Sequence, residues 1–189
     1  MPGIKYSLRQ ESTSFSIGTT NLRSSNGSLI DTNGCVALLV LSGFAVATIN
    51  FEKRILRKGD FVLLFYDSTF SMLSISAAFS VRYVSFAYHL IEEAIYKPLS
   101  INFWNTIYSN PVFRPNERDF KLLVEWWYQM EWVNNIKDYD YQEEILKNNI
   151  RNLLVATDIE IMDHAGDSLR NSRGHAWMLV NRFFRLLSS

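Results

Sequence analysis

Histidine, cysteine, serine and carboxylate side chains are the groups through which this chain could perform acid–base, nucleophilic or metal chemistry. The histidines are His89, His164 and His175, and none precedes residue 89. Cys35, the single cysteine, opens an apolar run in which a reactive thiolate is disfavoured. No serine lies in a recognisable nucleophile elbow, no glycine-rich loop could cradle a phosphate, and the acidic pair at 92–93 is typical of a solvated helix face. We therefore expect no catalytic site, no cofactor and no enzyme activity.

The charge of the chain is zero overall but is divided unevenly along the sequence. Residues 1–114 hold ten basic and seven acidic side chains, residues 115–164 hold five and eleven, and residues 165–189 hold four and one. Subtraction gives +3, −6 and +3 for the three segments. The acidic middle segment would repel phosphate, so we do not expect this chain to grip DNA strongly by itself.

The cellular compartment is inferred from the cysteine count and the hydropathy. A single cysteine cannot form an intramolecular disulfide, and the first residues have no secretory-signal pattern, so we expect a reducing cytoplasm. The apolar run at 35–49 is interrupted by small and polar residues and is too short to span a bilayer. We expect no membrane association.

The first half of the chain has the pattern of an antiparallel β structure. Apolar runs at 36–41, 44–51 and 61–66 are separated by short turns, with no helical segment that could make a parallel crossover. From 73 to 83 apolar and polar residues alternate strictly, and the apolar phase then changes at Val84, which predicts a bulge or a second buried face. We expect a sandwich or a closed barrel that follows a loose N-terminal arm.

The second half predicts two long helices joined by a short turn near 137–139. Asn116 is the expected N-cap of the first helix, and Asp140 with Glu143 gives a capping-box pattern at the start of the second. The apolar stripe on each helix favours an antiparallel hairpin. Trp126 and Trp127 diverge by about 100° around the first helix, so we expect something besides the chain's own core to cover its second face.

The last residues predict a connection and a further helix. Glycine, serine and small polar residues at 164–174 are typical of a flexible connection. The basic segment that follows carries apolar residues at helical spacing with nothing after them in sequence, so the chain has the character of the front part of a longer protein. These apolar residues are Trp177, Val180, Phe183, Phe184 and Leu187.

Several segments in order resemble the N-terminal region of AraC-family transcriptional regulators. They are the strand and hairpin at 41–50, the segment 56–64 with its Lys58-Gly59-Asp60 turn, and the strand at 79–86; residues 181–187 are similar to the segment that leads into the family's helix-turn-helix region. The resemblance covers residues 15–189. It implies an α+β fold in which an N-terminal antiparallel, cupin-like β-barrel is followed by a helical hairpin and a C-terminal linker helix. The implied parts are an arm at 1–14, a barrel with a short helix at 15–114, a dimerisation hairpin at 115–164, and at 165–189 a linker and the start of a missing DNA-binding domain.

The resemblance also implies where a ligand would bind. Enzymatic cupins hold a metal with two closely spaced histidines, a glutamate and a later histidine, and this chain departs from that pattern, so we expect no metal. A small barrel encloses side chains or one small ligand, which makes the barrel mouth the expected site for a small-molecule effector. The candidate residues, each also consistent with plain core packing, are Phe44, Val46, Thr48, Leu63, Phe65 and Phe86.

The helices are expected to act as a dimerisation element. In the family the equivalent helices pair across a two-fold axis, and we accordingly expect a homodimer through residues 116–163. A simple lid over the barrel is the alternative interpretation of the same stripes. The expected interface residues are Trp126, Trp127, Met130, Leu146, Ile150, Leu153 and Leu154.

These observations lead to the hypothesis of a regulatory module. It would sense an effector, dimerise, and contact DNA only through the missing C-terminal part. Two alternatives stay open: a cupin enzyme with an unusual metal set or none, and a stand-alone binding protein that ends at Ser189.

Overall fold

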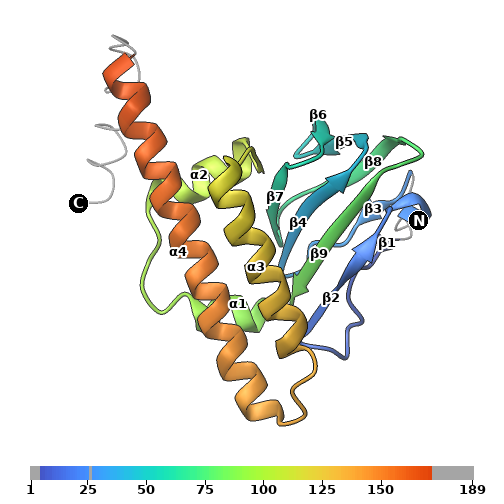
Figure 1. Ribbon diagram of the computed structural model, residues 1–189, viewed down its shortest axis with the longest axis vertical. Helices are drawn as coiled ribbons and strands as arrows, with labels where there is room; N and C mark the ends of the chain where they lie inside the picture. The colour runs from blue at the N-terminus through green and yellow to red at the C-terminus, as the bar shows by residue number, and fades with distance from the viewer. Residues whose placement is uncertain (1–4, 26, 172–189) are drawn as a thin grey trace.

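The computed structural model describes residues 5–25 and 27–171, and side chains from residue 6 to residue 162 within those ranges. Two five-stranded β-sheets pack face to face, and helices cover the outer face of one of them, which gives three layers (Figure 1). The expected α+β fold, with β structure first and helices after it, is confirmed.

The ten described strands divide equally between the two sheets. Sheet A has the order β1-β3-β8-β5-β6, and sheet B has the order β10-β7-β4-β9-β2. Every pairing is antiparallel except that of β1 with β3. The strands are β1 Lys5–Tyr6, β2 Phe15–Thr20, β3 Leu29–Ile30, β4 Cys35–Ser42, β5 Phe44–Ile49, β6 Glu52–Arg57, β7 Phe61–Phe65, β8 Phe70–Ile75, β9 Ser80–Phe86 and β10 Val112–Phe113, with a 3₁₀ turn at Arg23–Ser25.

The strands β4 and β7 of sheet B are buried on both faces, which explains their apolar sequences. In β4, alternate residues point in opposite directions. Val36, Leu38 and Val40 belong to the core between the sheets, whereas Cys35 and Leu39 belong to the core beneath the helices. A strand covered on two sides has no position for a polar residue, so it reads as a continuous apolar run.

The sheets do not close into the barrel that the resemblance implied. β1 and β6 form the edges of sheet A, β10 and β2 form those of sheet B, and no pairing joins the sheets among the described strands. The outer face of sheet B is apolar and is covered by the helices. The two sheets therefore form an open sandwich with a helical layer on one side. The sandwich was the alternative that the strand pattern allowed, and the closed barrel was wrong.

The described helices are α1 Tyr88–Ala94, α2 Ile101–Ser109, α3 Glu117–Val133 and α4 Tyr139–Asn171. The predicted N-cap of α3 is confirmed, because the Asn116 side chain accepts a hydrogen bond from the Asp119 N–H at 3.0 Å. At the start of α4 the predicted capping box is replaced by Asp138, whose carboxylate accepts from the Asp140 N–H at 3.1 Å and the Tyr141 N–H at 3.3 Å. The cap lies two residues earlier than expected, because the Asp138 side chain is the one within reach of those donors.

Three local expectations need correction. The alternating segment at 73–83 is not one strand: it covers the end of β8 in sheet A and the start of β9 in sheet B, and the turn that joins the two sheets has a hydrogen bond from the Phe79 N–H to the Ser76 carbonyl at 3.1 Å. The expected flexible connection at 164–174 is helical as far as Asn171, because α4 continues. The N-terminal arm is attached where it is described: β1 pairs with β3, and Leu8 is buried. The predicted helix at 177–187 lies outside the described residues.

Within residues 5–25 and 27–171, no helix combines the length and the apolar character that crossing a membrane requires.

Candidate ligand-binding cleft

A large cavity lies where sheet A meets the helices. Its volume is about 1160 Å³. The edge strand β6, the end of α2, β10 with the residues after it, the first half of α3 and the middle of α4 all contribute to its walls. The two long helices are joined near 134–138, so the cleft opens at the end of the hairpin far from that turn. Its volume is slightly above the usual range of small-molecule sites.

One wall of the cleft is apolar and aromatic. Phe61 and Phe113 lie with their ring centroids 6.1 Å apart, and Phe61 meets the ring of Trp127 edge-on at 6.3 Å. Trp126 packs against Trp127 at 5.0 Å and extends this wall along α3. Leucine and isoleucine side chains complete it, namely Leu122, Leu123, Leu153 and Ile161. This wall suits the apolar body of a ligand.

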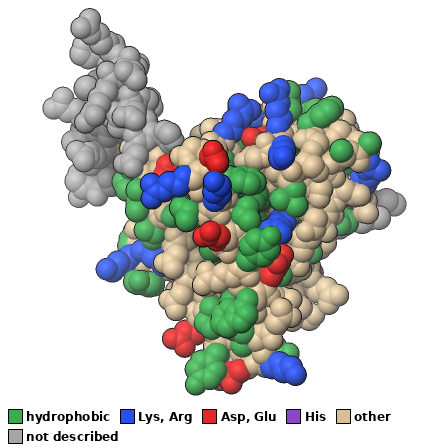
Figure 2. Space-filling model, in the orientation of Figure 1, with side chains coloured by type: hydrophobic (Ala, Val, Ile, Leu, Met, Phe, Trp, Pro, Cys, Tyr) green, Lys and Arg blue, Asp and Glu red, His purple; other side chains and the backbone are tan. Residues whose placement is uncertain are grey.

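The opposite wall is basic and comes mainly from β6. Lys53, Ile55 and Arg57 are alternate residues of one strand and therefore share a face. Both charged members are exposed, and no salt bridge to either is found among the described residues. Figure 2 shows Lys and Arg side chains over the β5–β6 hairpin at the top of the molecule. A ligand in the cleft would meet positive charge on this side.

Arg114 and Asp60 connect the basic wall to the fold. The Asp60 side chain is only 5% exposed, and its carboxylate lies 3.5 Å from Arg114 Nε. Its other oxygen accepts the Arg57 N–H at 2.8 Å. At the far end of β6, the Arg54 guanidinium donates to the Ser109 carbonyl at 2.7 Å and ties the strand to α2. The lining holds more basic than acidic residues: the basic ones are Lys53, Arg54, Arg57 and Arg114, and the acidic ones are Asp119 and Glu160.

Trp126 brings an unsatisfied hydrogen-bond donor to the cleft. Its indole Nε1–H is buried, and no acceptor lies within reach among the residues that the structure describes. A buried donor without an acceptor costs about 1–3 kcal/mol, and such groups are rare in folded proteins. A ligand oxygen would remove that cost only after the Trp126 side chain turns its N–H toward the cavity, because the nitrogen is buried from solvent in the free protein.

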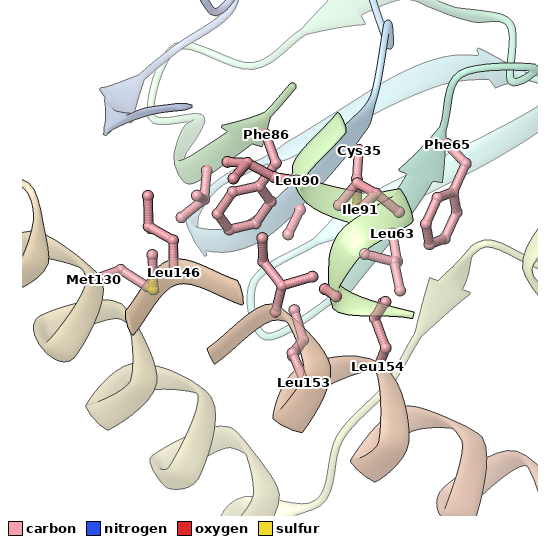
Figure 3. Close-up of a cluster of buried hydrophobic side chains, with 14 of the residues drawn as sticks. Cys35, Leu63, Phe65, Phe86, Leu90, Ile91, Met130, Leu146, Leu153 and Leu154 are labelled. Atoms are coloured by element: carbon pink, nitrogen blue, oxygen red, sulfur yellow. The ribbon is translucent and has the colours of Figure 1, made fainter. Parts of the chain in front are cut away.

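The six residues expected to bind a ligand are not brought together by the structure. Leu63, Phe65 and Phe86 lie in the core beneath the helices (Figure 3), whereas Phe44, Val46 and Thr48 are on the face of β5 that points away from sheet B. The inward phase of β5 is Ala45, Ala47 and Ile49. The three residues predicted on β5 have larger side chains than the inward Ala45 and Ala47, but they lie on its outer face. In β4 and β7 of sheet B, residues on both faces are apolar and buried, so the sequence pattern does not distinguish those that face sheet A from those that face the helices.

The expected dimer-interface residues are mostly occupied inside the protomer. Trp127, Met130, Leu146, Ile150, Leu153 and Leu154 are all buried against the outer face of sheet B and α1. Figure 3 shows Met130, Leu146, Leu153 and Leu154 pointing from the helices toward Phe86 and Leu63. Trp126 is half-buried and lines the cleft, so the second face of α3 is in part the wall of this cavity.

The remaining candidate chemical groups lie elsewhere. Burial raises the pKa of the Cys35 thiol far above its ordinary value, which disfavours the nucleophilic thiolate. No cluster of three or more metal-ligating side chains is present in the described part of the chain. Sequence reasoning missed Lys53, Arg57, Arg114 and Trp126 as cleft residues, although the alternation of charged and apolar residues in β6 was a visible signal.

No protein-family model and no curated protein matches the chain. Its layered fold is similar to that of the AraC-family regulator ToxT in the apo K231A structure from Vibrio cholerae strain SCE256, with a TM-score of 0.52 and 16% identity over 81% of this chain and 59% of that one. Wild-type ToxT of the same strain bound to an unsaturated fatty acid also matches, with a TM-score of 0.47 and 16% identity over 81% and 57% of the two chains.

A third match is ToxT from Vibrio cholerae O395 bound to (E)-4-(8-methylnaphthalen-1-yl)but-3-enoic acid, with a TM-score of 0.44 and 16% identity over 79% and 58% of the two chains. The likeness to the apo structure establishes a shared fold. This chain spans 59% of the length of that ToxT chain.

Proposed function

We propose that this chain is the effector-sensing domain of an AraC-type transcription regulator and that the cleft between β6 and the helices α3 and α4 is its ligand site. The observation that carries the proposal is the combination, in one cavity, of an aromatic wall, a basic wall and the unsatisfied Trp126 donor. The shared fold with ToxT is consistent with it. The role is regulatory and not catalytic.

The lining favours an anion with a sizeable apolar body as the ligand class. Arg54 and Arg114 are paired with Glu52 and Asp60, so Lys53 and Arg57 are the charges that attract an anionic head, and the wall from Phe61 to Ile161 accepts an apolar chain or ring. The ToxT structures described with an unsaturated fatty acid and with a naphthyl butenoic acid hold ligands of this kind. We extend the same chemistry to this chain.

The ligand would act by changing the relative populations of arrangements of the helices and the sandwich. The cleft is shared by β6, α3 and α4, so a ligand that binds one arrangement better than another shifts the equilibrium toward it. We propose that this arrangement is transmitted to a DNA-binding part outside these 189 residues, that the protein works in the cytoplasm, and that it acts as a homodimer.

Binding of oleate, followed by isothermal titration calorimetry, tests the site. We expect saturable binding below the critical micelle concentration, and methyl oleate, which keeps the apolar chain but lacks the charge, should bind about tenfold more weakly. Arg114→Gln should weaken oleate binding by a similar factor, because a hydrogen bond to a charged group contributes about 1.5–3 kcal/mol.

The matched control is Lys58→Gln, which removes one exposed basic residue from the turn after β6 without touching the lining. Its affinity for oleate should equal that of the wild type. Equal binding of the acid and the ester, or equal losses in the Lys58 and Arg114 variants, would contradict the assigned role of the basic wall. Absence of binding by both lipids would contradict the site itself.

A further inference from the structure

An exposed aromatic surface lies on the side of α2 that faces away from the core. Along α2, Ile101, Trp104 and Tyr108 are 58%, 39% and 51% exposed, while Phe103 and Ile107 on the opposite face are buried. Residues three, four and seven apart lie on one side of a helix. The exposed members therefore form a stripe that no described residue covers.

Neighbouring turns extend this stripe into a larger patch. The ring centroid of Trp104 is 5.1 Å from that of Phe65, and the next residue, Tyr66, stacks edge-on with Tyr88 at 5.1 Å. On the other side, the Asn50 amide donates to the Tyr108 carbonyl at 2.7 Å and fixes the β5–β6 turn against α2. We define the α2 surface as Phe51, Tyr66, Tyr88, Ile101, Trp104 and Tyr108.

Phe51 is the most unusual member of the α2 surface. The two-residue turn between β5 and β6 has φ of 49° at Asn50 and 66° at Phe51. This geometry favours Asn followed by Gly, and a bulky residue with positive φ is a genuine outlier. Phe51 is also 82% exposed, so contacts within the described chain do not offset its strain. Strain that persists in an exposed aromatic residue points to a contact outside the protomer.

We propose that the α2 surface is the interface through which two copies of this chain associate about a two-fold axis. From the exposed fractions of its side chains, the surface presents roughly 650 Å², within the range that each partner buries in a stable interface. Its composition, rich in Tyr, Trp and Phe, is that of interface centres. The inference rests on the proposed homodimer and replaces the helix residues expected from the sequence, which the protomer's own core occupies.

The charge pattern favours a second copy as the occupant. In a two-fold interface, residues near the axis face their own copies. No member of the α2 surface is itself charged, and the nearest carboxylates, Glu52 next to Phe51 and Glu92 hydrogen-bonded to Tyr88, lie at its rim. Another exposed apolar face, formed by Phe44 and Ile55 on sheet A, includes Lys53 and Arg57 on the same side of β6. Self-pairing of that face would place like charges opposite each other.

Sedimentation equilibrium of the 189-residue chain tests the inference. The protein concentration should run from about 1 to about 500 μM, which covers the dissociation constants of weak dimers. We expect a dimer whose dissociation constant rises about tenfold or more in Tyr108→Asp and in Phe51→Gly. The Phe51 variant should also raise the melting temperature of the monomer by about 2–4 °C, since glycine relieves the backbone strain. A purely structural role of Phe51 would not raise stability and weaken association together.

Trp132→Asp is the matched control, because Trp132 is an equally exposed aromatic residue on α3 outside the α2 surface. Its dissociation constant should be that of the wild type. A monomer at all concentrations, a dimer unaffected by Phe51→Gly, or a dimer dissociated by Trp132→Asp would each overturn the inference. Should Tyr108→Asp not fold, Phe51→Gly decides alone. Oleate affinity should be unchanged in all three variants, because none of these side chains lines the cleft. The dimer interface and the ligand site can therefore be refuted independently of each other.

Discussion

Replacing Trp126 by Phe tests the cleft at one of the unsatisfied donors of its lining residues. The substitution removes the buried indole N–H, whose desolvation without an acceptor costs about 1–3 kcal/mol. It also removes roughly 40 Å² of apolar area, which at about 25 cal/mol per Å² lowers the free energy of unfolding by about 1 kcal/mol. The unliganded variant should therefore be as stable as the wild type or more stable by up to about 2 kcal/mol.

Ligand binding should change in the opposite direction. If an acceptor oxygen of the ligand pairs with the Trp126 Nε1–H, its loss should weaken oleate binding by about tenfold, equivalent to about 1.4 kcal/mol. Urea unfolding of the free protein and calorimetry with oleate measure the two effects on the same sample. Trp132→Phe, at an exposed site of α3, is the matched control and should leave both quantities unchanged. A variant that is destabilised by more than about 2 kcal/mol and binds oleate normally would show that Trp126 is only a packing residue.

Two further predictions concern the fold. Gly43→Ala should destabilise the protein by more than about 3 kcal/mol, because φ is 69° and a Cβ would lie 2.6 Å from the Phe79 backbone N. Gly59→Ala, with φ of 91° and open space around it, should cost only about 1 kcal/mol. Equal losses of the free energy of unfolding in urea would refute the steric argument. The hydrogen bond and charge of Lys147 lower the pKa of Glu93, so this pair stabilises the protein above the ordinary glutamate pKa and the contribution is lost as the pH falls through the lowered value. Glu93→Gln should flatten the acid side of the stability profile, and an unchanged profile would contradict the pairing.

The sequence predicted the elements whose residues satisfy local rules. The apolar run of β4 and the cap at Asn116 depend on neighbours within a few residues, and both appear in the structure. It did not show that β4 is covered on both faces, because an unbroken apolar run does not reveal what covers each side. The layer of helices over sheet B follows from contacts between residues far apart in the chain.

The site residues were missed for a related reason. β6 alternates Lys53, Ile55 and Arg57 in the sequence, but only the arrival of β10 and α3 converts that edge into one wall of a cleft. The sequence analysis expected something other than the core to cover the second face of α3, and Trp126 on that face both packs against Phe86 of the core and lines the cleft. The choice of Trp127 as an interface residue was a geometric error, since it is fully buried against Phe61.

The indole resonances of the five tryptophans test the ligand site most directly. In a ¹H–¹⁵N titration with oleate, the account predicts that the Trp126 indole proton moves downfield and gains protection from exchange, while the resonance of exposed Trp132 stays in place. An unmoved Trp126 resonance, with shifts confined to residues between the two sheets such as Phe70 and Met72, would contradict it.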